Sequence, residues 1–313
     1  MPVVLWFVLA ISLVFGVPGG ASAEPATVAV LYPEIREPYR SVFLNIVKGI
    51  EDSIKGTAKQ YVLKEGDSLS ALKNGLESEH VQVVIALGTS GLAAAQQLPD
   101  RLRTVVGAVL MPPTENVRGV TGITLAPDPE ILFDRLKLLA PGVQRVTVVY
   151  SQQHNEWLIE RAREAARTRA LDLNALPASD IRASAIIYRD VLNKLEHASE
   201  AIWLPQDDAT VDESAILPLI LREAWDRNLI VISSNAAHVK KGALMALYPD
   251  NVGLGRSLAA LALNRAQISG LKTRGMLPLR DLLVAVNLRT AEHLGLDLMS
   301  RSRQEFDLMF PSP

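Results

Sequence analysis

The chain has 313 residues and a nearly balanced charge, with 32 Lys and Arg against 34 Asp and Glu. This balance excludes the basic surface of a nucleic-acid-binding protein, so we expect no nucleic-acid partner, and it gives no attraction to an anionic membrane. The sequence contains no cysteine, which excludes a disulfide framework and a lipid-modified cysteine. At about 150 residues per domain, the length predicts two domains.

An apolar run from Val3 to Val17 opens the chain, and the small residues Ala21-Ser22-Ala23 follow it. This order is typical of a secretory signal peptide and predicts cleavage after Ala23, although no Lys or Arg precedes the run. The alternative is a retained anchor, but the run is shorter than the roughly 20 residues that span a bilayer. We therefore expect residues 1–23 to be removed and the mature protein to be free in the periplasm.

Short β-branched runs alternate with segments of helical period from Ala26 onward, which predicts parallel sheets built from βαβ units. In the first half the expected strands are 28–31, 61–63, 81–87, 104–109 and 120–124, and the expected helices carry the apolar stripes of 42–54 and 69–76. The segment Leu125-Ala126-Pro127-Asp128-Pro129 then breaks the pattern. It predicts the first passage between two lobes.

The same alternation restarts in the second half. The expected strands are 145–150, 171–173, 201–204, 229–233, 243–247 and 282–286. The expected helices are 131–139, 157–166, 183–195, 212–225 and 290–296. A further helix is expected to be capped at Asp250 or Asn251 and to stop at Gly270. The polar tail from Ser300 is expected to be loose until Phe310. Two similar halves predict an α/β fold of two doubly wound parallel-sheet lobes that face each other. We expect lobe 1 to hold residues 24–125 and 250–280, and lobe 2 residues 126–249 and 281–313.

Ligands of open α/β sheets bind beyond the carboxyl ends of the strands, so the residues that follow each strand are candidate binding residues. In the first half these are Tyr32 and the turn Gly88-Thr89-Ser90. A glycine lets the backbone approach a ligand, and a helix that begins beside the hydroxyl residues offers free N–H groups to an anion. A ligand carboxylate would fit here, and the alternative is an ordinary capped helix start.

In the second half the corresponding candidates are Tyr150, Asp207 and the turn Ser233-Ser234-Asn235. We expect Asp207 to pair with a ligand ammonium across the cleft from the Gly88 turn, which would suit an amino acid. The alternative leaves Asp207 in solvent and lets Asp208 cap the next helix. Tyr32 and Tyr150 offer rings to a flat ligand, although rings at strand ends also pack in cores.

The sequence shows no catalytic or metal-binding motif. Leu92 stands where a nucleophile elbow needs its last glycine, and Gly253-Leu254-Gly255 lies within a helical stripe. The five histidines are scattered without ligand spacing, so we expect no metal site and no cofactor. With no base expected beside a nucleophile, we expect no enzyme.

Several segments, in this order and spacing, resemble one family of exported binding proteins. They are Val28–Leu31 with Pro38-Tyr39, Val84–Ser90, Asn116–Gly122, Leu138–Pro141, Val146–Tyr150, Trp203–Asp207, Gly242–Leu244, Gly253–Gly255, Asn287 and Ala291–Leu296. The chain resembles the periplasmic substrate-binding proteins of ABC transporters with the type I fold, in the group that includes tryptophan- and tyrosine-associated binding proteins.

The resemblance implies two lobes joined by a three-strand hinge, closure on a small-molecule ligand, and delivery to an ABC permease in the inner membrane. By position it places these residues at the cleft: Thr89, Ser90, Tyr150, Asp207 and Ser233 to Asn235. The chain departs from the family pattern at Met111-Pro112, where an Asp-Pro pair is usual, and at Asn235-Ala236-Ala237-His238, where a more acidic or serine-rich stretch is common.

The resemblance therefore favours a monomeric binding protein for a small polar, amino acid-like ligand, without carrying over a preference for aromatic amino acids. Two alternatives remain open. The first is a sensor component that presents its closed form to a receptor, and the second is an exported hydrolase.

Overall fold

The computed structural model describes residues 26–110, 120–195, 199–263, 275–298 and 305–311. The predicted signal peptide and the Met111-Pro112 turn lie outside these ranges. Within the described ranges, no helix has both the length and the apolar character that crossing a membrane requires.

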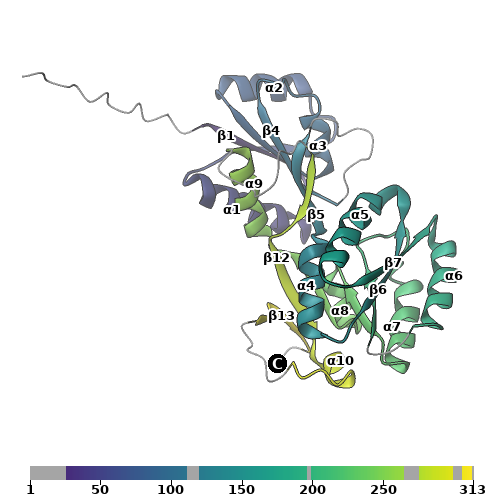
Figure 1. Cartoon of the computed structure of the whole chain (residues 1–313). Helices are drawn as coiled ribbons and strands as arrows, with labels where there is room; N and C mark the ends of the chain where they lie inside the picture. The colour runs from purple at the N-terminus through teal and green to yellow at the C-terminus, as the bar shows by residue number, and fades with distance from the viewer. Residues whose placement is uncertain (1–25, 111–119, 196–198, 264–274, 299–304, 312–313) are drawn as a thin grey trace, which may run out of the picture.

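Two sheets form the molecule, and each is the centre of one lobe (Figure 1). The sheet of lobe 1 has six strands in the order β11-β5-β4-β3-β1-β2, all of them parallel. Its strands are β1 Val28–Pro33, β2 Lys59–Leu63, β3 Val83–Leu87, β4 Arg103–Val109, β5 Thr121–Pro127 and β11 Met276–Leu279. Its helices are α1 Tyr39–Ile54, α2 Leu69–Ser78, α3 Gly88–Ala95 and α9 Asn251–Ala262.

The sheet of lobe 2 repeats this plan with seven strands in the order β13-β12-β10-β9-β8-β6-β7. Its strands are β6 Arg145–Ser151, β7 Asp172–Ala178, β8 Glu200–Leu204, β9 Ile230–Ser233, β10 Met245–Pro249, β12 Leu282–Asn287 and β13 Leu308–Phe310. Its helices are α4 Pro129–Leu139, α5 Gln152–Thr168, α6 Ile181–Leu192, α7 Ile216–Asp226, α8 Ala236–Lys241 and α10 Leu288–His293. The α/β fold of two doubly wound lobes is thus confirmed, except that β12 runs antiparallel to β10.

Helices cover both faces of each sheet, which explains why the strands are nearly continuous apolar runs. In lobe 1, α1 and α9 pack on one face around Ile46, Ile50 and Leu258, and α2 and α3 pack on the other around Leu76 and Leu92. In lobe 2, α4, α5 and α10 cover one face, and α6, α7 and α8 cover the other. Each lobe therefore has its own core.

Three passages join the lobes, as expected for a three-strand hinge. The chain crosses from β5 to α4 at Pro127–Pro129, from β10 to α9 at Pro249–Asn251, and from β11 to β12 at Leu279–Leu282. The backbone N–H of Asp128 donates to the carbonyl of Leu279 at 2.8 Å, and that of Asp250 donates to the carbonyl of Asp281 at 2.9 Å. These bonds tie the third passage to the other two. The predicted residue bounds of the lobes stay a prediction.

Some elements differ from the prediction. Strand β5 runs on to Pro127, so the first passage is the end of a strand. Helix α9 is described as far as Ala262, and its predicted stop at Gly270 lies outside the described residues. The short elements β11, β13 and α8 were not predicted from the sequence. They have four, three and six residues, and a periodic pattern of apolar residues cannot be recognised in segments this short.

Candidate functional site

The candidate site lies where the strand order reverses in each sheet, because ligands of such folds bind at this point. In lobe 1 the reversal lies between β1 and β3, and in lobe 2 between β6 and β8. The passages to the opposite lobe leave from the carboxyl ends of β5 and β10. The carboxyl ends of both parallel sheets therefore lie at the edge of their lobe that meets the hinge.

In lobe 1 the residues predicted from the sequence come together at this edge. Tyr32, the second-last residue of β1, lies beside Phe43 of α1, with ring centroids 6.5 Å apart and nearly parallel planes. Gly88 has φ of +72°, and a side chain there would meet the Phe43 ring at 3.3 Å and Pro33 at 3.6 Å. Only glycine combines this conformation with so close an approach between the ends of β1 and β3.

The turn at Gly88 begins α3, and the side chains of Thr89 and Ser90 are exposed. Leu87 is the N-cap of α3 and supplies no side-chain hydrogen bond to it. The first N–H groups of a helix have no partner within the helix, and its dipole favours an anion at this end. Thr89 and Ser90 therefore stand at an uncapped helix start that suits a carboxylate.

Two hollows flank these residues on lobe 1. The first, of 820 Å³, is lined by Tyr32, Pro33, Glu34, Ile35, Arg36, Glu37, Arg40, Phe43 and Val62. The second, of 550 Å³, lies between α2 and α3, and Ser90 and Gln97 line part of it. The guanidinium groups of Arg36 and Arg40 form no ion pair within the described ranges. Neither arginine was predicted from the sequence, because both follow the end of β1 by several residues.

In lobe 2, Asp207 holds the ends of β6 and β8 together. Its carboxylate accepts hydrogen bonds from the backbone N–H of Ser151 at 2.7 Å, the side-chain amide of Asn155 at 2.8 Å and the backbone N–H of Ala209 at 3.1 Å. Asp207 is only 6% exposed, so it is not the solvated residue that the alternative required. Asp208 does not cap the next helix either, since Asp212 binds the N–H groups of the residues that lead into α7.

The turn after β9 forms a second network, and here one sequence expectation is wrong. The hydroxyl of Ser233 lies 2.8 Å from Nδ1 of His238, so a base does stand beside a hydroxyl group. Glu213 lies 3.8 Å from the other ring nitrogen of His238. Ser233 has no exposed surface, however, and its oxygen also accepts the backbone N–H of Asn235. A substrate carbonyl could not reach this oxygen, and the arrangement links β9 to α8.

The remaining candidates of lobe 2 already have partners inside the lobe. The hydroxyl of Ser234 accepts the indole N–H of Trp203 at 3.2 Å, and Asn235 caps α8 through the N–H of Ala237. Tyr150 is buried, and its hydroxyl donates to Glu156 of α5 at 2.8 Å. Burial, and to a smaller extent this hydrogen bond, raises the pKa of Tyr150, so its phenol is neutral near pH 7.

The lobe 2 edge is thus a preorganised polar surface whose hydrogen bonds are mostly internal. Asn155, one turn inside α5, was also not predicted from the sequence, because it is a buried side chain that joins this network only through its bond to Asp207. Within the described ranges, no three His, Cys, Asp or Glu side chains gather as a metal site would require.

This architecture is similar to that of several solved structures. A domain in complex with L-Trp from Streptococcus pneumonia is 16% identical, with a TM-score of 0.53 over 90% of this chain and 100% of that one. The ligand-free, open substrate-binding protein CD0873 from Clostridium difficile is 13% identical, with a TM-score of 0.62 over 92% and 100%. A periplasmic ribose ABC transporter protein from Conexibacter woesei is 15% identical, with a TM-score of 0.52 over 92% and 99%.

These likenesses show that the chain has the type I periplasmic binding fold. A sequence search of curated proteins gave no match. Residues 45–298, however, match the profile of the family described as ABC transporter substrate binding protein. The chain therefore belongs to the ABC transporter substrate-binding protein family.

Proposed function

We propose that this protein captures a small polar, amino acid-like solute between its lobes in the periplasm and passes it to an ABC permease. The observation that supports this most is the uncapped start of α3 in lobe 1, which lies at the same hinge-side edge as the polar strand ends of lobe 2. The family match supports a small-molecule ligand and a permease partner. The signal-like segment at residues 1–23 supports export.

In lobe 1 we assign the ligand carboxylate to the start of α3. The N–H groups of its first turn and the exposed hydroxyls of Thr89 and Ser90 are donors that face no capping side chain. Arg36 and Arg40 offer guanidinium donors beside Tyr32 at the same edge, in a hollow that Glu34 and Glu37 also line. Donors and charge of this kind favour a carboxylate over a neutral sugar hydroxyl.

In lobe 2 we assign the ligand ammonium to Asp207. A carboxylate offers about four acceptor positions, and the internal hydrogen bonds of Asp207 use three of them. The remaining position would bind one ammonium proton. Ser151 and Asn155 would then act by holding the carboxylate in place, and Ser233, Ser234 and Asn235 by shaping the neighbouring turn.

A thermal-shift screen against amino acids, small organic acids, nucleobases and sugars tests the ligand class, because a ligand that binds only the folded state raises the melting temperature. We expect amino acids to give the largest shifts. Ser90→Ala should weaken binding of the best ligand by about 1–3 kcal/mol through a lost hydrogen bond to a charged group. Ser70→Ala, an exposed serine of α2, is the control and should bind as the wild type does. Equal affinity in both variants would remove Ser90 from the site.

Lobe closure is the second test. With three passages as the hinge, a ligand held by both lobes should stabilise a closed form. The radius of gyration from small-angle X-ray scattering should fall when the best ligand of the screen is saturating. A radius that stays constant while the ligand is bound would contradict capture between the lobes.

A further inference from the structure

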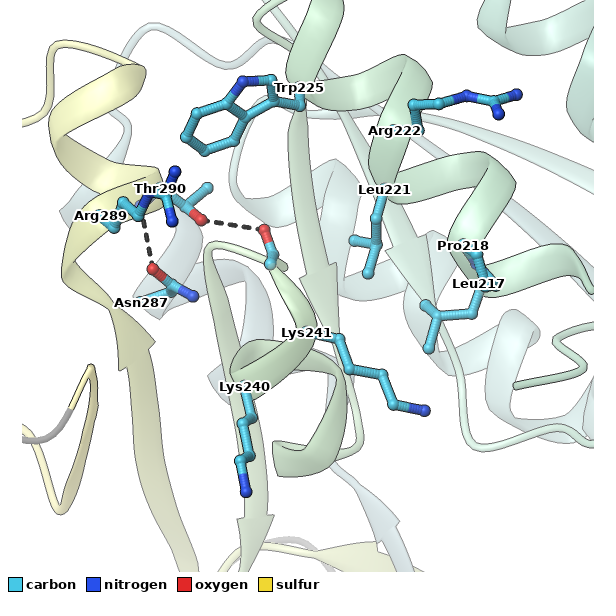
Figure 2. A pocket seen from close by; sticks show the side chains of 11 residues that line it. Leu217, Pro218, Leu221, Arg222, Trp225, Lys240, Lys241, Asn287, Arg289 and Thr290 are labelled. Carbon is cyan, nitrogen blue, oxygen red and sulfur yellow. Dashed lines mark hydrogen bonds between the residues drawn. The ribbon is translucent and has the colours of Figure 1, made fainter. Parts of the chain in front are cut away.

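A hollow of 530 Å³ lies on lobe 2, away from the cleft. Its walls come from α7, the end of α8 and the start of α10, as Figure 2 shows. Asn287, at its base, ends β12, and β12 runs antiparallel to β10. The hollow therefore lies at the amino ends of the parallel strands, opposite the edge that carries the candidate cleft.

Positive charge surrounds this hollow. Its lining residues are Leu217, Pro218, Leu221, Arg222, Trp225, Lys240, Lys241, Gly242, Asn287, Arg289 and Thr290. Four of them are cationic and none is acidic. Lys241 pairs with Glu213 at 2.7 Å, and Arg222 lies 3.7 Å from Glu223. Lys240 and Arg289 pair with no carboxylate within the described part of the chain, so their charge is available to an anion.

The walls of the hollow are rigid and partly apolar. Trp225 stacks on His293 with ring centroids 3.7 Å apart and planes 5° from parallel, and the guanidinium carbon of Arg289 lies 5.5 Å from the Trp225 ring. The Thr290 hydroxyl donates to the carbonyl of Gly242 at 3.0 Å, which fixes α10 against the end of α8 (Figure 2). Leu221 and the 36% exposed Trp225 give the hollow an apolar side.

We propose that this hollow is a second binding site, which takes a small amphipathic anion: an apolar or aromatic body that carries a carboxylate, sulfonate or phosphate. The body would lie against Trp225 and Leu221, and the acidic group would bind Arg289, with Lys240 adding positive charge at the other end of the hollow (Figure 2). The volume falls in the range of small-molecule sites, about 300–1,000 Å³, which have apolar walls and a few placed charges. Three elements close the hollow on its sides, so a small molecule fits it better than an extended peptide does.

A matched pair of fluorescent probes tests this proposal. The probe 1-anilinonaphthalene-8-sulfonate has an aromatic body with an anionic group, and N-phenyl-1-naphthylamine has the same body without the charge. We expect saturable binding of the sulfonate to the full protein, weakening as salt is raised. The double variant Lys240→Gln/Arg289→Gln should bind the sulfonate at least tenfold more weakly, with affinity for the neutral probe unchanged.

The control is Lys48→Gln/Lys64→Gln, which removes the same charge from exposed positions on lobe 1, one of them beside the hollow between α2 and α3. It should bind the sulfonate as the wild type does. The single variant Arg222→Gln, also exposed, should weaken binding by a smaller factor and serves if the double variant folds poorly. Unchanged affinity in the lobe 2 variants, an equal loss in the lobe 1 control, or equal affinity for both probes would each overturn the proposal.

Discussion

The imidazole of His238 is enclosed between the turn after β9 and the first residues of α7. It is 3% exposed and binds the hydroxyl of Ser233. Burial lowers the pKa of His238, an effect that Glu213 and Asp208 oppose and Lys241 reinforces. The folded protein therefore holds this ring in its neutral form near pH 7.

This burial predicts a loss of stability in mild acid. The unfolded chain protonates the ring near a pKa of about 6.5, whereas the folded protein resists protonation, so the free energy of unfolding should fall as the pH drops below that value. One such group contributes up to about 1.4 kcal/mol per pH unit until the folded pKa is reached. Urea denaturation of wild type and His238→Asn from pH 7 to 5 measures the difference.

The free energy of unfolding of His238→Asn should depend less on pH than that of wild type. At pH 7 it should be somewhat lower, because the hydrogen bond to Ser233 is lost. His80→Asn removes an exposed histidine and is the control, with the wild-type slope expected. Identical slopes for His238→Asn and wild type would contradict the assignment.

At this scale the sequence predicts which residues follow a strand but not which way their side chains point. Thr89 and Ser90 are exposed at a helix start, as their position suggested. Tyr150 is also expected at a strand end, but it lies inside β6, and its ring belongs to the lobe 2 core with its hydroxyl bonded to Glu156 of α5. Only the packing of α5 on β6 decides between these two outcomes.

Helices α1 and α9 cross with almost no space between their backbones. A Cβ on Gly49 would lie 2.0 Å from the carbonyl oxygen of Val252, and a Cβ on Gly255 would lie 2.0 Å from that of Ile46. Figure 1 shows the two helices side by side on lobe 1, although about two hundred residues separate them in the chain. This contact fixes the last helix of lobe 1 to the first.

Gly255→Ala should therefore destabilise the protein by about 1–3 kcal/mol, because the helices must separate to admit the methyl group. Gly56→Ala is the matched control: nothing lies within 4 Å of its Cβ position, and its stability should stay within about 0.5 kcal/mol of wild type. Chemical denaturation followed by circular dichroism measures both variants. Tolerance of Gly255→Ala would mean that the helices are less closely packed than the structure indicates.

At the scale of elements, the apolar stripes of α1, α2 and α9 predict helices at the right places, since each stripe faces a buried sheet. The close crossing of α1 and α9 was not predicted. From the sequence, Gly253-Leu254-Gly255 is only part of a helical stripe. Its role follows from a partner helix far away in the sequence, which no local pattern identifies.

The two lobes are held at the hinge by an ion cluster as well as by the backbone. Arg280, in the third passage, forms ion pairs with Asp128 in the first passage and with Glu130 of α4 at 2.8 Å. Arg169 of α5 extends this cluster, since it lies 3.7 Å from Glu130 and 2.6 Å from Asp134. The Arg280 side chain is 57% exposed, so its contribution to total stability should be below about 1 kcal/mol. Because Arg280 links the third passage to the first, we expect it to restrict the movement of the two lobes relative to each other.

Arg280→Gln should broaden the range of distances between the lobes without unfolding the protein. Spin labels at Lys48→Cys in α1 and Arg161→Cys in α5 report this distance, and the chain has no native cysteine to interfere. Arg101→Gln, which breaks the exposed pair with Glu77 within lobe 1, is the control and should leave the distribution as it is. A distribution of unchanged width in Arg280→Gln would show that the backbone bonds alone set the hinge.

The chain order of lobe 1 has a consequence for synthesis. Strands β1 to β5 are synthesised early, but α9 and β11 are synthesised only after all of β6 to β10. Until then the face of α1 that carries Gly49 has no partner, and β5 is an open edge of its sheet. Lobe 2 lacks only β12, α10 and β13 at that stage, so the lobe begun first is completed close to the end of translation.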